Sequence, residues 1–213
     1  MCIRDSCYTS SFVNIRRMGA SVCLCFFILL LNSTVARATS ILQLSFDQLV
    51  EQSALVFEGK VVSSEAHWNQ QHTRIHTYVK FEISEIIKGR AVSDSITLRF
   101  AGGQVGEDHQ KFESMIYPLK GESGIYFVER VDINMVNPLL GWSQGHFLIN
   151  GDKMMTNQHR TIIKINPVSK ARKNSFSLSE GEVKGMLSTS RNSNLDAGLS
   201  VSEFKRQIRA QEE

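Results

Sequence analysis

Three of the six histidines in the chain lie within ten residues, in the segment HWNQQHTRIH at positions 67–76. The spacing of His72 and His76 is that of two zinc ligands on one face of a helix, where a glutamate after the first histidine would act as a general base. Thr73 occupies that position in this chain. Whether these histidines can share a metal ion therefore depends on the secondary structure of the segment.

The residues that follow alternate between two kinds of side chain, with the period of two that is typical of a half-buried strand. One set is Ile75, Thr77, Val79, Phe81 and Ile83, and the other is Arg74, His76, Tyr78, Lys80 and Glu82. In a strand that begins by His72, the positions of His72 and His76 are about 13 Å apart, at ~3.3 Å per residue. One zinc ion with bonds of about 2 Å does not bridge that distance. We therefore expect solvated histidines on a strand face and its leading loop, and no metal or other cofactor.

Residues 1–38 have the order of a secretory signal, in which a basic start precedes an apolar run. Arg16 and Arg17 are followed by the apolar residues 20–31, and Ala36 and Ala38 are the narrow side chains that signal peptidase requires. An uncleaved anchor is the alternative, but twelve apolar residues are short of the roughly 20 that span a bilayer.

Cleavage is expected between Ala38 and Thr39, which would export the mature chain to the periplasm or the exterior without a membrane span. Met18 offers another start for the protein, and in that case residues 1–17 are an artefact of the gene model.

The mature chain that remains after removal of this leader differs in composition from the full sequence. All four cysteines belong to it, namely Cys2, Cys7, Cys23 and Cys25. The mature chain then has no disulfide, no thiolate metal ligand and no cysteine nucleophile. Four basic residues and one acid leave with it, so that 20 of 24 basic and 20 of 21 acidic residues remain. A formal charge of zero gives no reason to expect a nucleic-acid partner.

The elements that must position any site are mainly β-strands. Ser45 with Gln48 predicts a short capped helix, and the strand at 54–66 has a bulge or bend at Gly59. Further strands are expected at 95–100, 125–131, 141–154 and 159–167, with a hairpin turn at Asn150-Gly151. The sequence therefore predicts a mainly β fold, an antiparallel OB-like barrel or rolled sheet with short flanking helices, over residues 39–167.

Residues 168–213 are expected to form a polar linker and short helices that dock on the β-domain or partly fray. Two helices are predicted there, because a Ser-x-x-Glu capping pattern occurs twice, at Ser177/Glu180 and at Ser200/Glu203. The second helix has a narrow apolar stripe, made of Val201, Phe204 and Ile208. The residues between the two helices, 188–198, are expected to be mobile.

The candidate binding residues lie in loops and beside aromatic side chains. Gly102 and Gly103 begin a glycine-rich loop, but neither a Lys-Ser/Thr pair nor a dinucleotide spacing follows, so a plain connection is favoured over a phosphate site. The two tryptophans are candidates for ligand contact, and core or edge packing explains them equally well. The six candidates are Trp68, Gly102, Gly103, Trp142, Gln144 and His146.

The order of elements resembles an uncharacterised family of secreted bacterial proteins over residues 41–149, through the segments EIIKG, GESGIYFVE and GWSQGHFLI. In outline it is also similar to the netrin-like domain of tissue inhibitors of metalloproteinases, a five-stranded OB-type barrel with strands like ALVFEGKVVS and YVKFEISEIIKG. Those inhibitors bind the protease zinc through an N-terminal cysteine amine. This chain has Thr39 at its predicted mature N-terminus, so the resemblance implies the fold and leaves inhibition open.

Two classes of function remain from the sequence. The first is a non-catalytic binding module whose partner is an envelope or extracellular protein, met through the loops around Trp68 and residues 102–109. The second is a secreted hydrolase or an inhibitor-like protein. Against a hydrolase, the chain has no GxSxG elbow and no metal-ligand helix, and we expect no catalytic residue among the candidates. A pocket that gathers a histidine, a carboxylate and a hydroxyl would favour the hydrolase.

Overall fold

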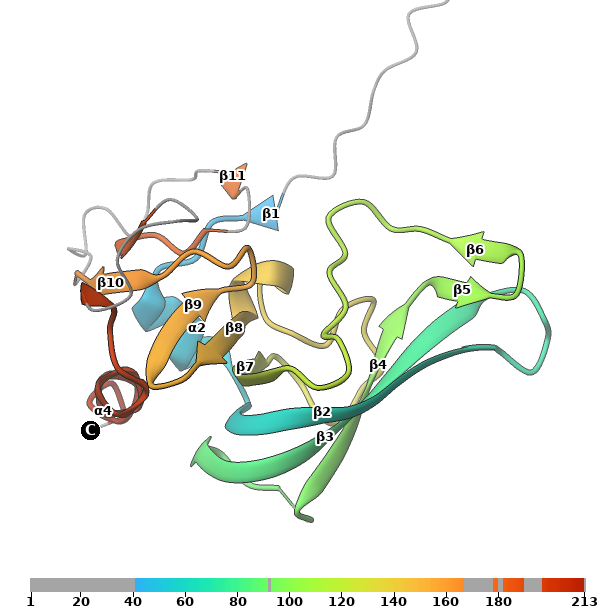
Figure 1. The fold of residues 1–213 in the computed structure, drawn as a ribbon. Coiled ribbons are helices and arrows are strands. Elements are labelled where there is room, and N and C mark those ends of the chain that lie inside the picture. The colour runs from blue at the N-terminus through green and yellow to red at the C-terminus, as the bar shows by residue number, and fades with distance from the viewer. Residues whose placement is uncertain (1–40, 92, 167–177, 180–181, 190–196, 213) are drawn as a thin grey trace, which may run out of the picture. The chain divides into compact units, whose positions relative to one another are not determined.

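A six-stranded antiparallel sheet organises the protein, in the order β4-β3-β2-β7-β8-β9 (Figure 1). The computed structural model describes residues 41–91, 93–166, 178–179, 182–189 and 197–212. All of them belong to one compact unit, Ser40–Glu213. The strands are β2 (Leu55–Trp68), β3 (Ile75–Lys88), β4 (Ser95–Ala101), β7 (Ser123–Val128), β8 (His146–Asn150) and β9 (Lys153–Thr156).

Three small strand pairs and two helices surround this sheet. The pairs are β1 (Ile41–Leu42) with β11 (Leu178–Ser179), β5 (Gly103–Val105) with β6 (Asp108–Gln110), and β10 (Ile162–Ile165) with β12 (Met186–Ser188). The helices are α2 (Phe46–Gln52) and α4 (Val201–Arg209), and a 3-10 turn η1 spans Trp142–Gly145. The fold is mainly β and antiparallel, as predicted. Within the described residues β4 and β9 end the sheet, which is not closed into a barrel.

The segment with three histidines is strand and turn rather than helix, as the alternation predicts. Ile75, Thr77, Val79 and Phe81 are all buried in β3. His72 lies in the turn before β3, with φ of 51°, and His76 pairs with His67 of β2. Among the residues that the structure describes, no group of three histidine, cysteine, aspartate or glutamate side chains is arranged to hold a metal ion.

Two apolar clusters pack on the two faces of the sheet, because neighbouring residues of each strand point to opposite faces. Phe57 of β2 and Tyr126 of β7 belong to one cluster, whereas Val56 and Phe127, one position away, belong to the other. The second cluster is covered by apolar side chains of α2 and α4, which are Phe46, Leu49, Val50, Phe204 and Ile208.

Helix α2 begins as the sequence predicts, at Ser45. The Ser45 hydroxyl accepts a hydrogen bond from the Gln48 backbone N–H, and the Gln48 side chain accepts one from the Ser45 N–H. This capping box satisfies two N–H groups that the first helical turn leaves without partners.

Helix α4 also begins as predicted, with Ser200 as its N-cap and Phe204 fully buried against Phe46. Lys205 forms ion pairs with Glu58 of β2 and Glu85 of β3, which fixes the polar side of the helix against the sheet. Among the described residues, neither α4 nor α2 has the length and apolar character that a bilayer crossing requires.

The prediction of a helix that begins near Ser177 is wrong for the part of this segment that the structure describes. Residues 178–179 form β11 with β1, and residues 186–188 form β12 with β10. Gly185 separates these segments with φ of 85°, a backbone conformation that a helix cannot include. Ser177, Glu180 and most of the linker expected at 188–198 lie outside the described residues, as do the leader, the cleavage site at Ala38-Thr39 and Pro167.

Smaller differences concern where strands begin and end. The glycine-rich stretch after β4 is a two-stranded hairpin, β5–β6, rather than a plain loop. β7 ends at Val128 rather than residue 131, and β8 begins at His146 because η1 occupies the preceding residues. Gly59 lies at one of three register shifts between β2 and β3, as its predicted bulge requires.

Candidate functional site

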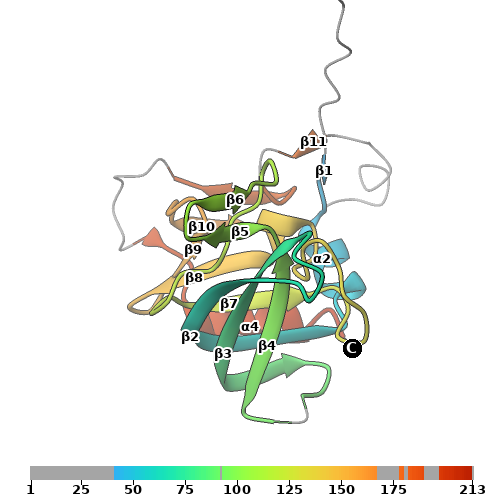
Figure 2. The same ribbon diagram turned by 90° about the vertical axis from the view of Figure 1, so that its right-hand side faces the viewer.

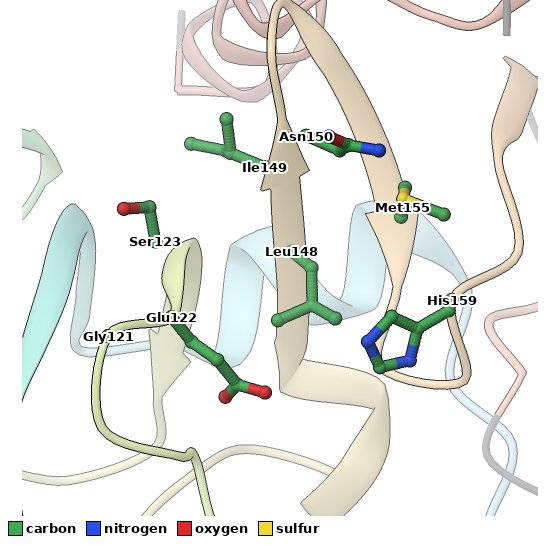
Figure 3. A pocket seen from close by; sticks show the side chains of 8 residues that line it. All are labelled: Gly121, Glu122, Ser123, Leu148, Ile149, Asn150, Met155 and His159. Atoms are coloured by element: carbon green, nitrogen blue, oxygen red, sulfur yellow. The ribbon is translucent and has the colours of Figure 1, made fainter.

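A pocket of about 310 Å³ opens on the sheet where β7, β8 and β9 lie side by side (Figure 3). This volume is at the lower end of the range for small-molecule sites. Its lining includes Glu122 and Ser123 at the start of β7, Leu148 and Asn150 of β8, Met155 of β9, and His159 from the turn after β9.

The strand period places the polar groups of the site on one face. Glu122, Gly124 and Tyr126 are two residues apart along β7, so their side chains share a face. On β8, His146 pairs with Tyr126 and Leu148 pairs with Gly124. The pairing of two neighbouring strands therefore brings a carboxylate, a phenol and an imidazole together.

Glu122 is the acidic group of the pocket, and its side chain is 20% exposed. Its Oε2 accepts a hydrogen bond of 2.6 Å from the backbone N–H of Leu119. Burial raises the pKa of the Glu122 carboxyl, although the Leu119 N–H and the charge of His159 act in the opposite direction. Glu122 is thus a carboxyl group with restricted access to water.

His146 lies close to Glu122 and is almost completely buried, with 2% of its surface exposed. Its Nε2 is 3.7 Å from Oε2 of Glu122, which is too long for a direct hydrogen bond. Within the described residues, neither ring nitrogen has a hydrogen-bond partner. Burial, with a smaller effect of His159, lowers the pKa of His146 to about 4. The imidazole is therefore neutral at pH 7, and its contact with Glu122 is not an ion pair.

Tyr126 stacks on His146, with ring centroids 5.3 Å apart and 28° between the ring planes. Its hydroxyl is buried without a hydrogen-bond partner among the described residues. Burial raises the pKa of Tyr126, and the charge of Glu122 raises it further. A Cβ added to Gly124 would lie 3.1 Å from this hydroxyl and 2.2 Å from the Phe147 carbonyl oxygen. Glycine is required there because the phenol and a backbone carbonyl occupy the space of a side chain.

His159 forms the opposite rim of the pocket, across Leu148 from Glu122 (Figure 3). It is exposed and has a positive φ of 61°, and its N–H donates to the Thr156 carbonyl at 2.9 Å. Ser123 also lines the pocket, but its hydroxyl points away from both Glu122 and His159 in Figure 3.

The arrangement can hold a cationic or hydrogen-bond-donating group against Glu122, beside the apolar surface of Leu148 and Met155. A carboxyl with a raised pKa can also transfer protons. A serine nucleophile needs its hydroxyl within hydrogen-bond reach of a base, and the Ser123 hydroxyl points away from both Glu122 and His159 (Figure 3).

Of the six candidates from the sequence, the structure brings His146 alone into this cluster. The side-chain amide of Gln144 instead connects backbone segments, since its Oε1 accepts from the Leu44 N–H at 2.8 Å and its Nε2 donates to the Leu42 and Gly141 carbonyls. Gln144 is fully enclosed and acts as a structural link.

The glycine and tryptophan candidates lie elsewhere in the fold. Gly102 and Gly103 have positive φ angles of 83° and 128°. A Cβ at Gly103 would lie 2.3 Å from the Thr77 hydroxyl, so these glycines let the β5–β6 hairpin fold against β3. Trp68 ends β2 with its ring 6.0 Å from that of His72, and Trp142 begins η1 with φ of 60°. Both tryptophans are half-buried.

Sequence reasoning missed Glu122, Tyr126 and His159. The local signal that could have indicated the first two is the alternation in the segment ESGIYF, residues 122–127, in which a glutamate, a glycine and a tyrosine fall on one strand face. His159 has no such signal, because it reaches the pocket from a turn. No protein-family model, curated protein or solved structure that was compared with the chain matches it.

Proposed function

We propose that the protein is an exported, non-catalytic binding module whose pocket accepts the primary ammonium group of its ligand. The half-buried carboxylate of Glu122 carries this proposal. It is positioned by the Leu119 N–H in a pocket that also offers apolar surface from Leu148 and Met155. An ammonium group would donate hydrogen bonds to the carboxylate and offset the cost of burying its charge.

Two sources of such an amine fit the same chemistry. One is a small amine with an apolar body, and the other is the N-terminal amine of a polypeptide, which proteins can capture as a recognition feature. The second source agrees with the expectation of an envelope or extracellular protein as the partner. The pocket volume of about 310 Å³ suits the end of a chain or a small molecule.

A secreted hydrolase is the second candidate function, because the pocket lining does include a histidine, a carboxylate and a hydroxyl. These are His159, Glu122 and Ser123. The direction of the Ser123 hydroxyl argues against it, since consecutive strand residues point to opposite faces and Ser123 follows Glu122 directly (Figure 3).

An OB-like, netrin-like scaffold remains part of the proposal. The long bulged β2 followed by the alternating β3 supports the likeness to that domain. An inhibitor-like role receives less support, because the mature chain expected from Thr39 has no cysteine at its N-terminus.

Calorimetric titration tests the proposal, with hexylamine compared with hexanol and hexanoate. Hexylamine should bind most tightly, and Glu122→Gln should weaken its binding by at least about tenfold, while the exposed Glu113→Gln serves as the matched control. Affinity should also fall as the pH is lowered through the raised pKa of Glu122, because protonation removes the anionic charge.

A peptide with a free N-terminus and its N-acetylated form separate the two amine sources. Equal binding of hexylamine and hexanol, or no effect of Glu122→Gln, would reject the ammonium site. Turnover of ester, peptide or glycoside substrates that disappears in Glu122→Gln would replace the proposal with the hydrolase.

A further inference from the structure

A second surface of the protein gathers three basic side chains. It is the outer face of β2, β3 and β4, the side opposite Phe81 and Phe100, and it presents Arg74, Lys80 and Arg99. In Figure 2 these three strands lie side by side at the front. Within the described part of the chain, none of the three cations forms an ion pair with a carboxylate.

The register of the strands places these residues close together. Tyr78 of β3 pairs directly with Arg99 of β4, and Lys80 pairs with Thr97 two residues further along β3. Arg74 precedes β3 and is two residues from His76, so these two side chains approach the same face. Arg74 to Lys80 spans six residues, or about 20 Å along the strand.

Arg99 is held in position by His76. Its Nη1 donates to Nε2 of His76 at 3.1 Å, which requires a neutral imidazole. Burial and the charges of Arg99 and Arg74 lower the pKa of His76 and keep the imidazole in that form. The Nε of Arg99 is buried and has no hydrogen-bond partner among the described residues. A preformed guanidinium of this kind suits a carboxylate or sulfate group.

The other side chains of this face limit the kind of anion that fits. Tyr78 is 37% exposed and provides a flat ring between the cations, and His67 lies beside it with ring centroids 6.1 Å apart. Two acids share this face. Glu65 of β2 contacts His67 at 3.5 Å rather than any of the three cations, and Glu82 lies two residues beyond Lys80 on β3. A lipid surface would need protruding apolar side chains among the cations. A nucleic acid favours a basic protein, and the mature chain expected from Thr39 has 20 basic and 20 acidic residues.

We propose that this outer face binds an acidic polysaccharide, with Arg74, Arg99 and Lys80 contacting its acidic groups and Tyr78 packing against a sugar ring. A linear polymer with one charge on each repeating unit matches cations spread along a strand. This binding does not involve the pocket near Glu122, so the two proposals stand or fall separately.

Calorimetry with polygalacturonate, dextran sulfate and neutral dextran in low-salt buffer provides the test. The wild-type protein should bind one or both acidic polymers and not neutral dextran, and the preference shows whether carboxylate or sulfate is the favoured group. Arg74→Gln/Arg99→Gln should weaken binding by at least about tenfold, and added salt should weaken binding to the wild-type protein. The matched control, Arg90→Gln/Lys164→Gln, removes the same charge from exposed sites away from this face.

Arg99→Lys gives a second check, because lysine keeps the charge but lacks the planar fork that His76 positions. It should bind more weakly than the wild type and more tightly than Arg99→Gln, with an unchanged circular-dichroism spectrum. Equal loss in the control variant, binding to neutral dextran, or no binding to either acidic polymer would overturn the proposal. Tighter binding to single-stranded DNA or to phosphatidylglycerol vesicles than to both polymers would also overturn it.

Discussion

Buried His146 should make the stability of the fold sensitive to acid. Its pKa is lowered from 6.5 to about 4 in the folded protein. Between these values the unfolded chain binds a proton that the folded chain does not bind, so the free energy of unfolding falls as the pH falls from 6.5 to 4. At 1.36 kcal/mol for each pKa unit, the loss over this range is about 3 kcal/mol.

Glu122 faces His146 and acts in the opposite direction over part of the range. Because burial raises its pKa above 4.5, the folded chain takes up a proton on Glu122 at a higher pH than the unfolded chain does. This uptake stabilises the fold as the pH falls toward 4.5. Glu122→Gln should therefore lose stability more steeply in acid than the wild type. Tyr126 and His159 are the other titratable groups that face His146.

Urea unfolding from pH 7 to pH 4 measures this effect in the wild type and in His146→Phe. Phenylalanine keeps a ring against Tyr126 and carries no proton, and the distant carboxyl groups contribute equally to both proteins. The stability of the variant relative to the wild type should rise by about 3 kcal/mol as the pH falls from 7 to 4. His146→Gln repeats the comparison if the phenylalanine variant does not fold. Parallel pH profiles for the wild type and both variants would refute the assignment of a buried neutral histidine.

Three further predictions follow from packing and from the sequence. Phe81→Ala should lower the free energy of unfolding by about 3–5 kcal/mol, because Phe81 is fully buried. Replacing the exposed Lys80 by alanine should change it by no more than about 0.5 kcal/mol. Similar losses of stability in urea unfolding would mean that the β3 register is wrong. Phe204→Ala should lower the free energy of unfolding by about 3–5 kcal/mol, and Glu85→Gln should lower it by less than about 1 kcal/mol. A larger loss for Glu85→Gln in thermal unfolding would show that ion pairs hold α4 against the sheet. Mass spectrometry of the exported protein should find Thr39 at its N-terminus, and an intact leader retained in the membrane would contradict export by cleavage.

Local patterns predict the strands and caps well, because the physical cause lies within a few residues. The alternation from Ile75 to Phe81 reports which face of β3 is buried, and the Ser45/Gln48 and Ser200/Glu203 pairs mark the starts of both helices. The same Ser-x-x-Glu pattern fails near Ser177, because pairing with β1 and β10 overrides a weak local preference.

The candidate site is harder to predict, because its residues meet through the pairing of strands. The contact of Glu122 with His146 depends on the register of β7 and β8, which no short segment specifies. Gln144 shows the converse. Its polar side chain could have bound a ligand, but it forms hydrogen bonds with backbone groups instead, and one of these groups, the Leu44 N–H, is 100 positions away in the sequence.

The packing of α4 on α2 has a consequence for the order of folding. The rings of Phe46 and Phe204 are 5.4 Å apart, so this contact of the first helix forms only after α4 has been synthesised, whereas Phe127, which Phe46 also contacts, comes earlier in the chain. Contacts between residues so distant in sequence form slowly, because a long loop must close before they contribute. The apolar cluster that α2 and α4 share is therefore completed only when α4 packs against it, whereas the cluster on the other face of the sheet contains no residue of α4.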